Sequence, residues 1–127
     1  MANHLTLPPN IDTTPADEIW LNGPCLITQS TSLQLINQGS KRLMWRIYAD
    51  ARNRYLVRPK KGVLKAKEKF NLFVLCYPFP FRPDSPNTDT LTIEWTEATE
   101  NHDHFDEDWF TKSRVARRKN INVSFNP

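Results

Sequence analysis

The residues whose types could do chemistry gather in one acidic segment. His102 and His104 flank Asp103, and the carboxylates of residues 106–108 follow directly. Imidazole and carboxylate groups are ligands for divalent cations, so the segment has the composition of a weak cation site. A solvated acidic loop has the same composition and is much the more common structure. The sequence therefore predicts no metal site.

Evidence for catalysis is equally thin in the rest of the chain. No candidate nucleophile stands in a recognisable spacing with a base that could activate it. The three glycines, at positions 23, 39 and 62, are too few and too scattered to form a glycine-rich phosphate loop. We predict that the protein is not an enzyme, uses no cofactor and acts by binding.

Basic and aromatic residues are interleaved between Lys41 and Lys69. Such a pattern can stack RNA bases on a sheet face, but Trp45 is in phase with the core and leaves Tyr48 as the main exposed aromatic. We therefore predict no nucleic-acid partner. A peptide or receptor is the alternative ligand for this face, and the candidate protein-binding residues are Arg46, Tyr48, Arg52 and Arg54.

Charge is segregated along the chain although the formal net charge is only +3. Residues 1–40 carry three acids and no base, and residues 41–82 carry twelve bases and two acids. Residues 83–111 carry nine acids and no base, and residues 112–127 carry five bases. The blocks either place opposite potentials on different surfaces, which favours salt-sensitive association, or interleave in the fold and cancel.

The elements that position these residues are strands. Apolar residues recur with a period of two, and turn-forming residues interrupt them at short intervals, as in an antiparallel sandwich. With 127 residues the chain has the size of one domain, residues 1–127. We predict an all-β antiparallel sandwich of about seven strands. The candidate strands are residues 18–22, 32–37, 43–49, 55–57, 70–77, 90–95 and 120–125. Alternation assigns Leu43, Trp45 and Ile47 to the core face and Met44, Arg46 and Tyr48 to the other face. In the same way it assigns Leu91, Ile93 and Trp95 to the core face and Thr90, Thr92 and Glu94 to the other.

The candidate strand at residues 70–77 is apolar on both faces, so a second cover is expected. The cover is either the segment 108–110 of the same chain or another molecule, and we favour the segment. Several prolines follow this strand and should end its pairing: Pro78, Pro80, Pro83 and Pro86.

The sequence also predicts the cellular compartment of the protein. The longest apolar run, residues 72–77, is far shorter than the roughly 18 residues of a membrane span, and residues 1–5 have no features of a secretory signal. We predict a cytosolic protein without a membrane span. Two cysteines in such a chain are typically buried thiols, so Cys25 and Cys76 are not expected to form a disulfide.

Read in order, the segments between these strands resemble the nematode major sperm protein family over the full length. The residues that carry the resemblance are INQGSKR at 36–42, VRP at 57–59, GVL at 62–64, DTLTIEWT at 89–96, DWF at 108–110, VARRKN at 115–120 and FNP at 125–127. The chain is identified as a divergent member.

The resemblance implies a seven-stranded immunoglobulin-like β-sandwich of the kind shared with PapD, in which Pro15 and Pro59 can be cis. It also implies a structural protein of the sperm pseudopod cytoskeleton, which forms homodimers and nucleotide-independent filaments for amoeboid motility, or a paralogue that joins such filaments. Partners would be the chain itself or other filament proteins of the family. Release without a signal peptide, toward a cell-surface receptor, is a further implication.

One departure from the family pattern bears on the alternative function. Adaptor relatives bind acidic peptides through a Lys-Thr-Thr element, whose positions are Tyr48, Ala49 and Asp50 here. The added carboxylate should repel an acidic peptide, although nearby arginines can compensate. A signalling or adaptor module thus remains the alternative to self-association. For self-association the candidate residues are Glu18, Ile19, Trp20, Leu21 and Asn22.

Overall fold

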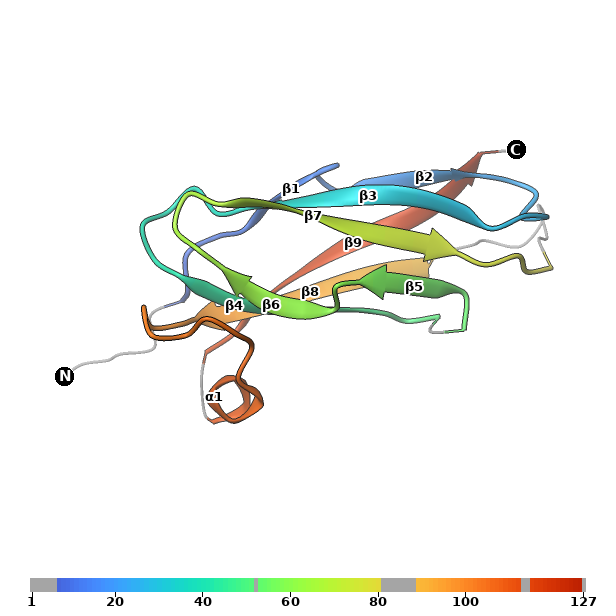
Figure 1. Ribbon diagram of the computed structural model, residues 1–127. Helices are drawn as coiled ribbons and strands as arrows, with labels where there is room; N and C mark the ends of the chain where they lie inside the picture. The colour runs from blue at the N-terminus through green and yellow to red at the C-terminus, as the bar shows by residue number, and fades with distance from the viewer. Residues whose placement is uncertain (1–6, 52, 81–88, 113–114, 127) are drawn as a thin grey trace.

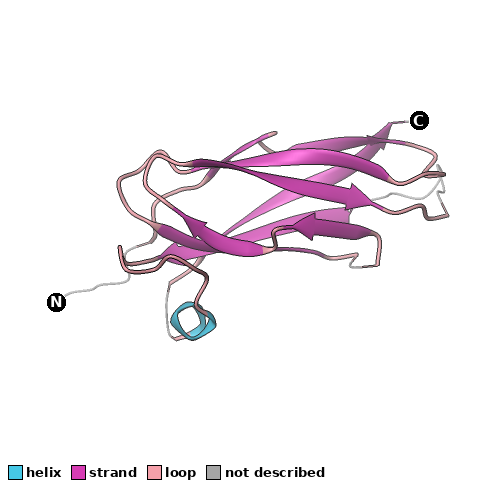
Figure 2. Cartoon of the chain, viewed as in Figure 1, coloured by secondary structure: helices cyan, strands magenta, loops and turns pink. Residues whose placement is uncertain are grey.

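The computed structural model describes residues 7–51, 53–80, 89–112 and 115–126. These residues form nine strands and one short helix, α1 (Glu107–Thr111). Figure 1 and Figure 2 show the strands as two layers with α1 outside them. The strands are β1 (Asp12–Thr14), β2 (Glu18–Asn22), β3 (Gln29–Ile36), β4 (Leu43–Ala49), β5 (Tyr55–Arg58), β6 (Lys61–Leu64), β7 (Lys69–Cys76), β8 (Asp89–Glu97) and β9 (Arg117–Asn126).

The strands form a β-sandwich. One sheet has the order β1-β3-β7-β5 and the other has the order β2-β9-β8-β4-β6. All neighbours are antiparallel except β2 and β9, which run parallel from Glu18 opposite Asn122 to Asn22 opposite Asn126. The edge strands β1 and β2 therefore lie along one long side of the sandwich, and β5 and β6 lie along the other (Figure 1).

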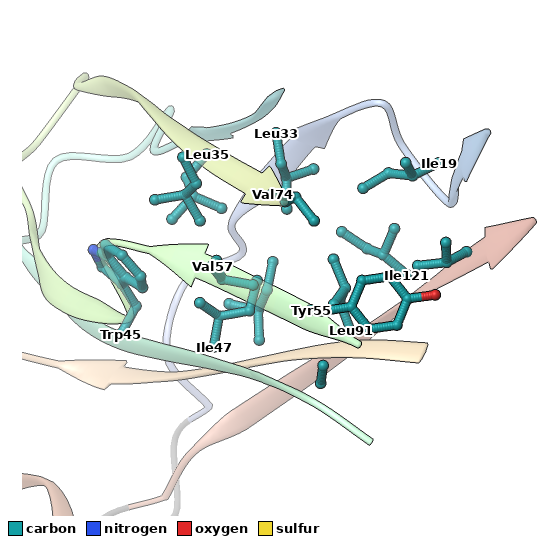
Figure 3. Close-up of a cluster of buried hydrophobic side chains, with 14 of the residues drawn as sticks. Ile19, Leu33, Leu35, Trp45, Ile47, Tyr55, Val57, Val74, Leu91 and Ile121 are labelled. Carbon is teal, nitrogen blue, oxygen red and sulfur yellow. The ribbon is translucent and has the colours of Figure 1, made fainter. Parts of the chain in front are cut away.

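The alternation of apolar residues produces the core between the two sheets. On β4, Leu43, Trp45 and Ile47 are buried, and Trp45 lies opposite Trp95 of β8. Figure 3 shows side chains from both sheets meeting in the same layer. Burying such side chains stabilises each by about 1.5–3 kcal/mol relative to exposure, which makes this layer the main source of stability.

All seven expected strands are present, with end shifts of up to three residues, and the sandwich class is confirmed. The expected count of seven is wrong, because nine strands occur within the described residues. The two that were missed, β1 and β6, are three and four residues long. Strands this short give too few residues for a period of two to be recognised. The Thr14–Pro15, Gly23–Pro24 and Arg58–Pro59 bonds are cis.

The expected cover of the strand at residues 70–77 is wrong. α1 lies against the other sheet: the Trp109 Nε1 donates to the Glu97 carbonyl at 2.8 Å, and the Arg46 guanidinium lies 4.3 Å from the Phe110 ring centroid. Met44, expected on the outer face, is buried beneath this segment, and its sulfur accepts from the Asp106 amide. The outer face of β7 stays open, and Phe73 there is 65% exposed.

Both cysteines are buried free thiols, as predicted. Gln29 is the ladder partner of Cys76, and its side-chain amide donates to the Cys25 sulfur at 3.9 Å. Burial raises the pKa of both thiols, that of Cys76 to about 11. The thiolate forms that would react are therefore suppressed near neutral pH.

Candidate functional site

The outer face of the five-stranded sheet is organised around Glu94 of β8. The Arg46 Nε donates to one carboxylate oxygen at 2.9 Å, and the Arg118 Nη2 donates to the other at 2.6 Å. Burial alone would raise the pKa of Glu94, but the hydrogen bonds from Arg118 and Arg46 outweigh it and lower the pKa. The carboxylate therefore stays ionised and neutralises charge at the centre of this face.

Two of the predicted protein-binding residues meet here. Arg46 is held by Glu94 and lies 3.9 Å from the Glu107 carboxylate, so its charge is shared between two acids. Tyr48 lies two residues further along β4, partly exposed, with its hydroxyl 3.5 Å from Glu94. Their contacts to one carboxylate place these two side chains together.

Arg54 belongs to a different cluster, and Arg52 lies outside the described residues. The Arg54 guanidinium donates to Asp89 at 3.1 Å and lies 3.9 Å from the Phe79 ring centroid. The Tyr55 hydroxyl donates to the same Asp89 oxygen, and burial raises the pKa of this phenol. This cluster ties β5 to the start of β8, which gives Arg54 a role in joining the two sheets.

Sequence reasoning did not find the partnership of Glu94 with Arg118. The alternation along residues 90–95 did place Glu94 on the outer face, which was the available signal. The partner follows from the register, because β8 and β9 place Glu94 opposite Arg118, and β4 and β8 place it opposite Arg46.

A groove opens beside Tyr48, between β4 and β5. β6 pairs only with residues Leu43 to Arg46 of β4, so the remainder of β4 faces β5 across a cleft. The cleft has a volume of about 390 Å³. Its lining is mostly aliphatic and aromatic with one cation, formed by Ile47, Tyr48, Ala49, Tyr55, Leu56, Val57, Lys60 and Tyr77.

The five residues predicted for self-association form β2, which is an edge strand. Ile19 and Leu21 are buried in the core, whereas Trp20 between them is 59% exposed. At the strand end, the Gln29 side chain accepts from the Asn22 amide at 2.7 Å and donates to the Asn22 carbonyl at 2.6 Å. The backbone of β2 is thus hydrogen-bonded to Gln29 at Asn22, whereas the edge around Trp20 is open to solvent.

Two further features concern other functions. The helix within the described residues, α1, is neither long enough nor apolar enough to cross a membrane. In the same part of the chain no three His, Cys, Asp or Glu side chains are grouped as a metal site would require. His102 instead packs against Trp109, with ring centroids 4.6 Å apart.

The architecture and its surfaces define an immunoglobulin-like sandwich that presents a groove on one long side and an exposed edge strand on the other. Comparisons with known proteins place it more narrowly. Residues 10–114 match the MSP (Major sperm protein) domain family. The chain belongs to this family.

Relatives in two nematodes agree with this assignment. Major sperm protein 77/79 of Caenorhabditis elegans is 33% identical over 121 residues, covering 94% of this chain and 95% of the relative. Major sperm protein isoform alpha of Ascaris suum is 32% identical over 120 residues, covering 94% of each.

Among solved structures, the C. elegans MSP family member WR4 superimposes with a TM-score of 0.74 at 17% identity, covering 93% of this chain and 99% of WR4. PapD-like domain 7 of human CEP192 gives a TM-score of 0.56 at 11% identity, covering 99% of this chain and 93% of that domain. Likeness at these identities shows the shared sandwich fold.

Proposed function

We propose that this protein is a structural subunit of the nematode sperm cytoskeleton, which self-associates into dimers and nucleotide-independent filaments or joins filaments built by its relatives. The relatives that match nearly the whole chain are major sperm proteins. The role is non-catalytic, and its place is the cytoplasm of the sperm pseudopod, with other filament proteins of the family as partners.

The observation that carries the proposal is the open edge strand β2 with its exposed tryptophan. A sheet edge offers unpaired backbone groups to another strand, and proteins that remain monomeric usually guard such edges. Here Trp20 adds apolar area next to the open edge, and aromatic residues are enriched at protein interfaces. Both features favour contact with another protein copy.

The alternative is an adaptor that binds a peptide or receptor through Arg46, Tyr48, Arg52 and Arg54. Arg46 and Arg54 are each paired with a carboxylate of the same chain, so an acidic ligand would have to compete with these pairs. Among the three members of this set that the structure describes, Tyr48, at the groove, is the one most available to a ligand. The ion pairs make self-association the better supported function.

Sedimentation equilibrium of the purified chain tests the proposal over roughly a hundredfold range of concentration, at low salt and at about 0.15 M salt. We expect dimers that grow into larger species and that weaken as salt increases. A strict monomer under all conditions would contradict self-association. It would leave the adaptor, with binding of an acidic peptide or a receptor, as the function to pursue.

A further inference from the structure

The fold shows whether the charge blocks of the sequence lie on different surfaces or interleave and cancel. Acids of the third block are largely paired: Asp89 with Arg54, Glu94 with Arg46 and Arg118, Glu97 with Lys41, and Asp103 with Arg42. The blocks therefore interleave, and their charges cancel around Glu94 in the five-stranded sheet. Other charges of the described residues remain without an ion pair.

Three cations without a carboxylate partner among the described residues lie on the side of the sandwich formed by β5 and β6: Arg58, Lys60 and Lys61. Lys61 lies 5.1 Å from the Phe105 ring centroid, a contact that does not neutralise its positive charge. We call this set the basic edge.

The opposite side, formed by β1 and β2, has the opposite sign. Its acids are Asp12, Asp17 and Glu18, and none of them pairs with a cation in the described part of the chain. Asp12 accepts from Asn10 and Gln38, and Glu18 accepts from Ser124, which are all neutral donors. We call this set, together with Trp20, the acidic edge.

The shapes of the two edges also differ in a complementary way. Trp20 is exposed on the acidic edge, and Asp17 and Glu18 precede it along the chain. The groove on the other side has a volume of about 390 Å³, a largely apolar lining and Lys60 in its wall. An aromatic side chain buries about 150–250 Å² in such a site, and a lysine over its ring adds a cation–π attraction.

We propose that the acidic edge of one copy docks against the basic edge of a second copy, with Trp20 inserted into the groove between β4 and β5. Because the two surfaces are different and lie on opposite sides of the sandwich, the contact is head-to-tail and leaves a free edge at each end. Repeated contacts therefore extend into a filament. This inference rests on the proposed function and specifies its propagating contact.

The tryptophan is tested by Trp20→Thr, with Phe73→Thr as the matched control. Both positions are exposed aromatics on strands, and Phe73 lies on the outer face of β7, opposite Arg58 of β5 and outside the groove. Sedimentation equilibrium should show a dissociation constant raised roughly 30-fold or more for Trp20→Thr, the effect of losing a binding hot spot. Phe73→Thr should change it by less than about threefold. Equal effects of the two variants would overturn the proposal.

The charges are tested by Asp17→Lys and Lys60→Glu. Each variant alone should associate more weakly than the unmodified chain, because like charges then face each other. An equimolar mixture of the two should recover association, since every contact in an alternating chain again joins opposite charges. Lys112→Glu, at an exposed lysine that belongs to neither edge, should behave as the unmodified chain. A mixture as weak as its components would overturn the proposal.

The outcomes separate this inference from the function on which it rests. If the unmodified chain is monomeric throughout, both fail. If the chain associates and neither edge variant weakens it, only the edge-to-edge contact fails, and the groove is then free for another partner. Circular dichroism and thermal unfolding of each variant verify that lost association is not lost folding.

Discussion

The two long edges of the sandwich differ in how they meet another strand. On the basic edge, Lys60 and Lys61 place solvated charges beside β5 and β6, and lysines at an edge discourage pairing between identical strands. On the acidic edge no base occurs in residues 1–40, and only the end of β2 is occupied, by Gln29. In the proposed contact, the charges of unlike edges attract, whereas the charges of two like edges repel each other. The comparison teaches that the two sides of one sandwich differ enough to serve as the two halves of a head-to-tail contact.

The largest expected loss of stability comes from shortening a buried side chain of β2, the strand that carries Trp20 on its exposed face. Ile19 is fully buried, and Ile19→Ala should lower the free energy of unfolding by about 2–4 kcal/mol through lost burial and the cavity left behind. Urea denaturation measures it. Trp20→Thr, on the opposite face of the same strand, is the control and should cost less than about 1 kcal/mol. Equal losses would mean that Trp20 supports the fold and is not available for a partner.

A smaller effect is expected at the basic edge. Gly62 of β6 lies over the Trp45 indole, and an added Cβ would lie 3.2 Å from the Cζ2 atom of that ring. Gly62→Val should therefore destabilise the protein by about 1–3 kcal/mol, because the ring or the strand must move. Thermal unfolding measures it, with Lys61→Thr as a control on the same strand. An unchanged stability would show that β6 is loosely held.

The smallest effect concerns the neutral face between the edges. Glu94→Gln should lower stability at neutral pH by about 1–2 kcal/mol, because two charge-assisted hydrogen bonds are weakened. Glu97→Gln, which loses one exposed pair with Lys41, should cost less than about 0.5 kcal/mol.

The pH dependence of Glu94 has a definite sign. Its pKa is lower in the folded state than in the unfolded chain, so the stabilisation is fully present above the ordinary glutamate pKa. It is lost as the pH falls toward and through the lower folded value. The difference between the unmodified chain and Glu94→Gln should therefore shrink on acidification, as measured by denaturation at several pH values. A difference that is constant with pH would contradict the assignment.

Much of the fold followed from the pattern of residues. Alternation in residues 43–49 and 90–95 predicted strands whose core faces are the ones observed, because a strand sends successive side chains to opposite sides. The alternation failed at Met44, where the segment before α1 covers a position that the pattern assigned to solvent. Local periodicity describes one strand and carries no information about what packs on its outer face.

The sequence by itself determined the sandwich class, the core face of each long strand, the membership of the family and the segregation of charge, since all of these depend on residue types in order along the chain. Only the tertiary structure decided which charges cancel. Arg46 and Glu94 are 48 residues apart, and Glu94 and Arg118 are 24 apart, yet strand register places all three together. Burial and pairing across such separations depend on the register of the sheet, which also leaves the acidic and basic edges unpaired on opposite sides.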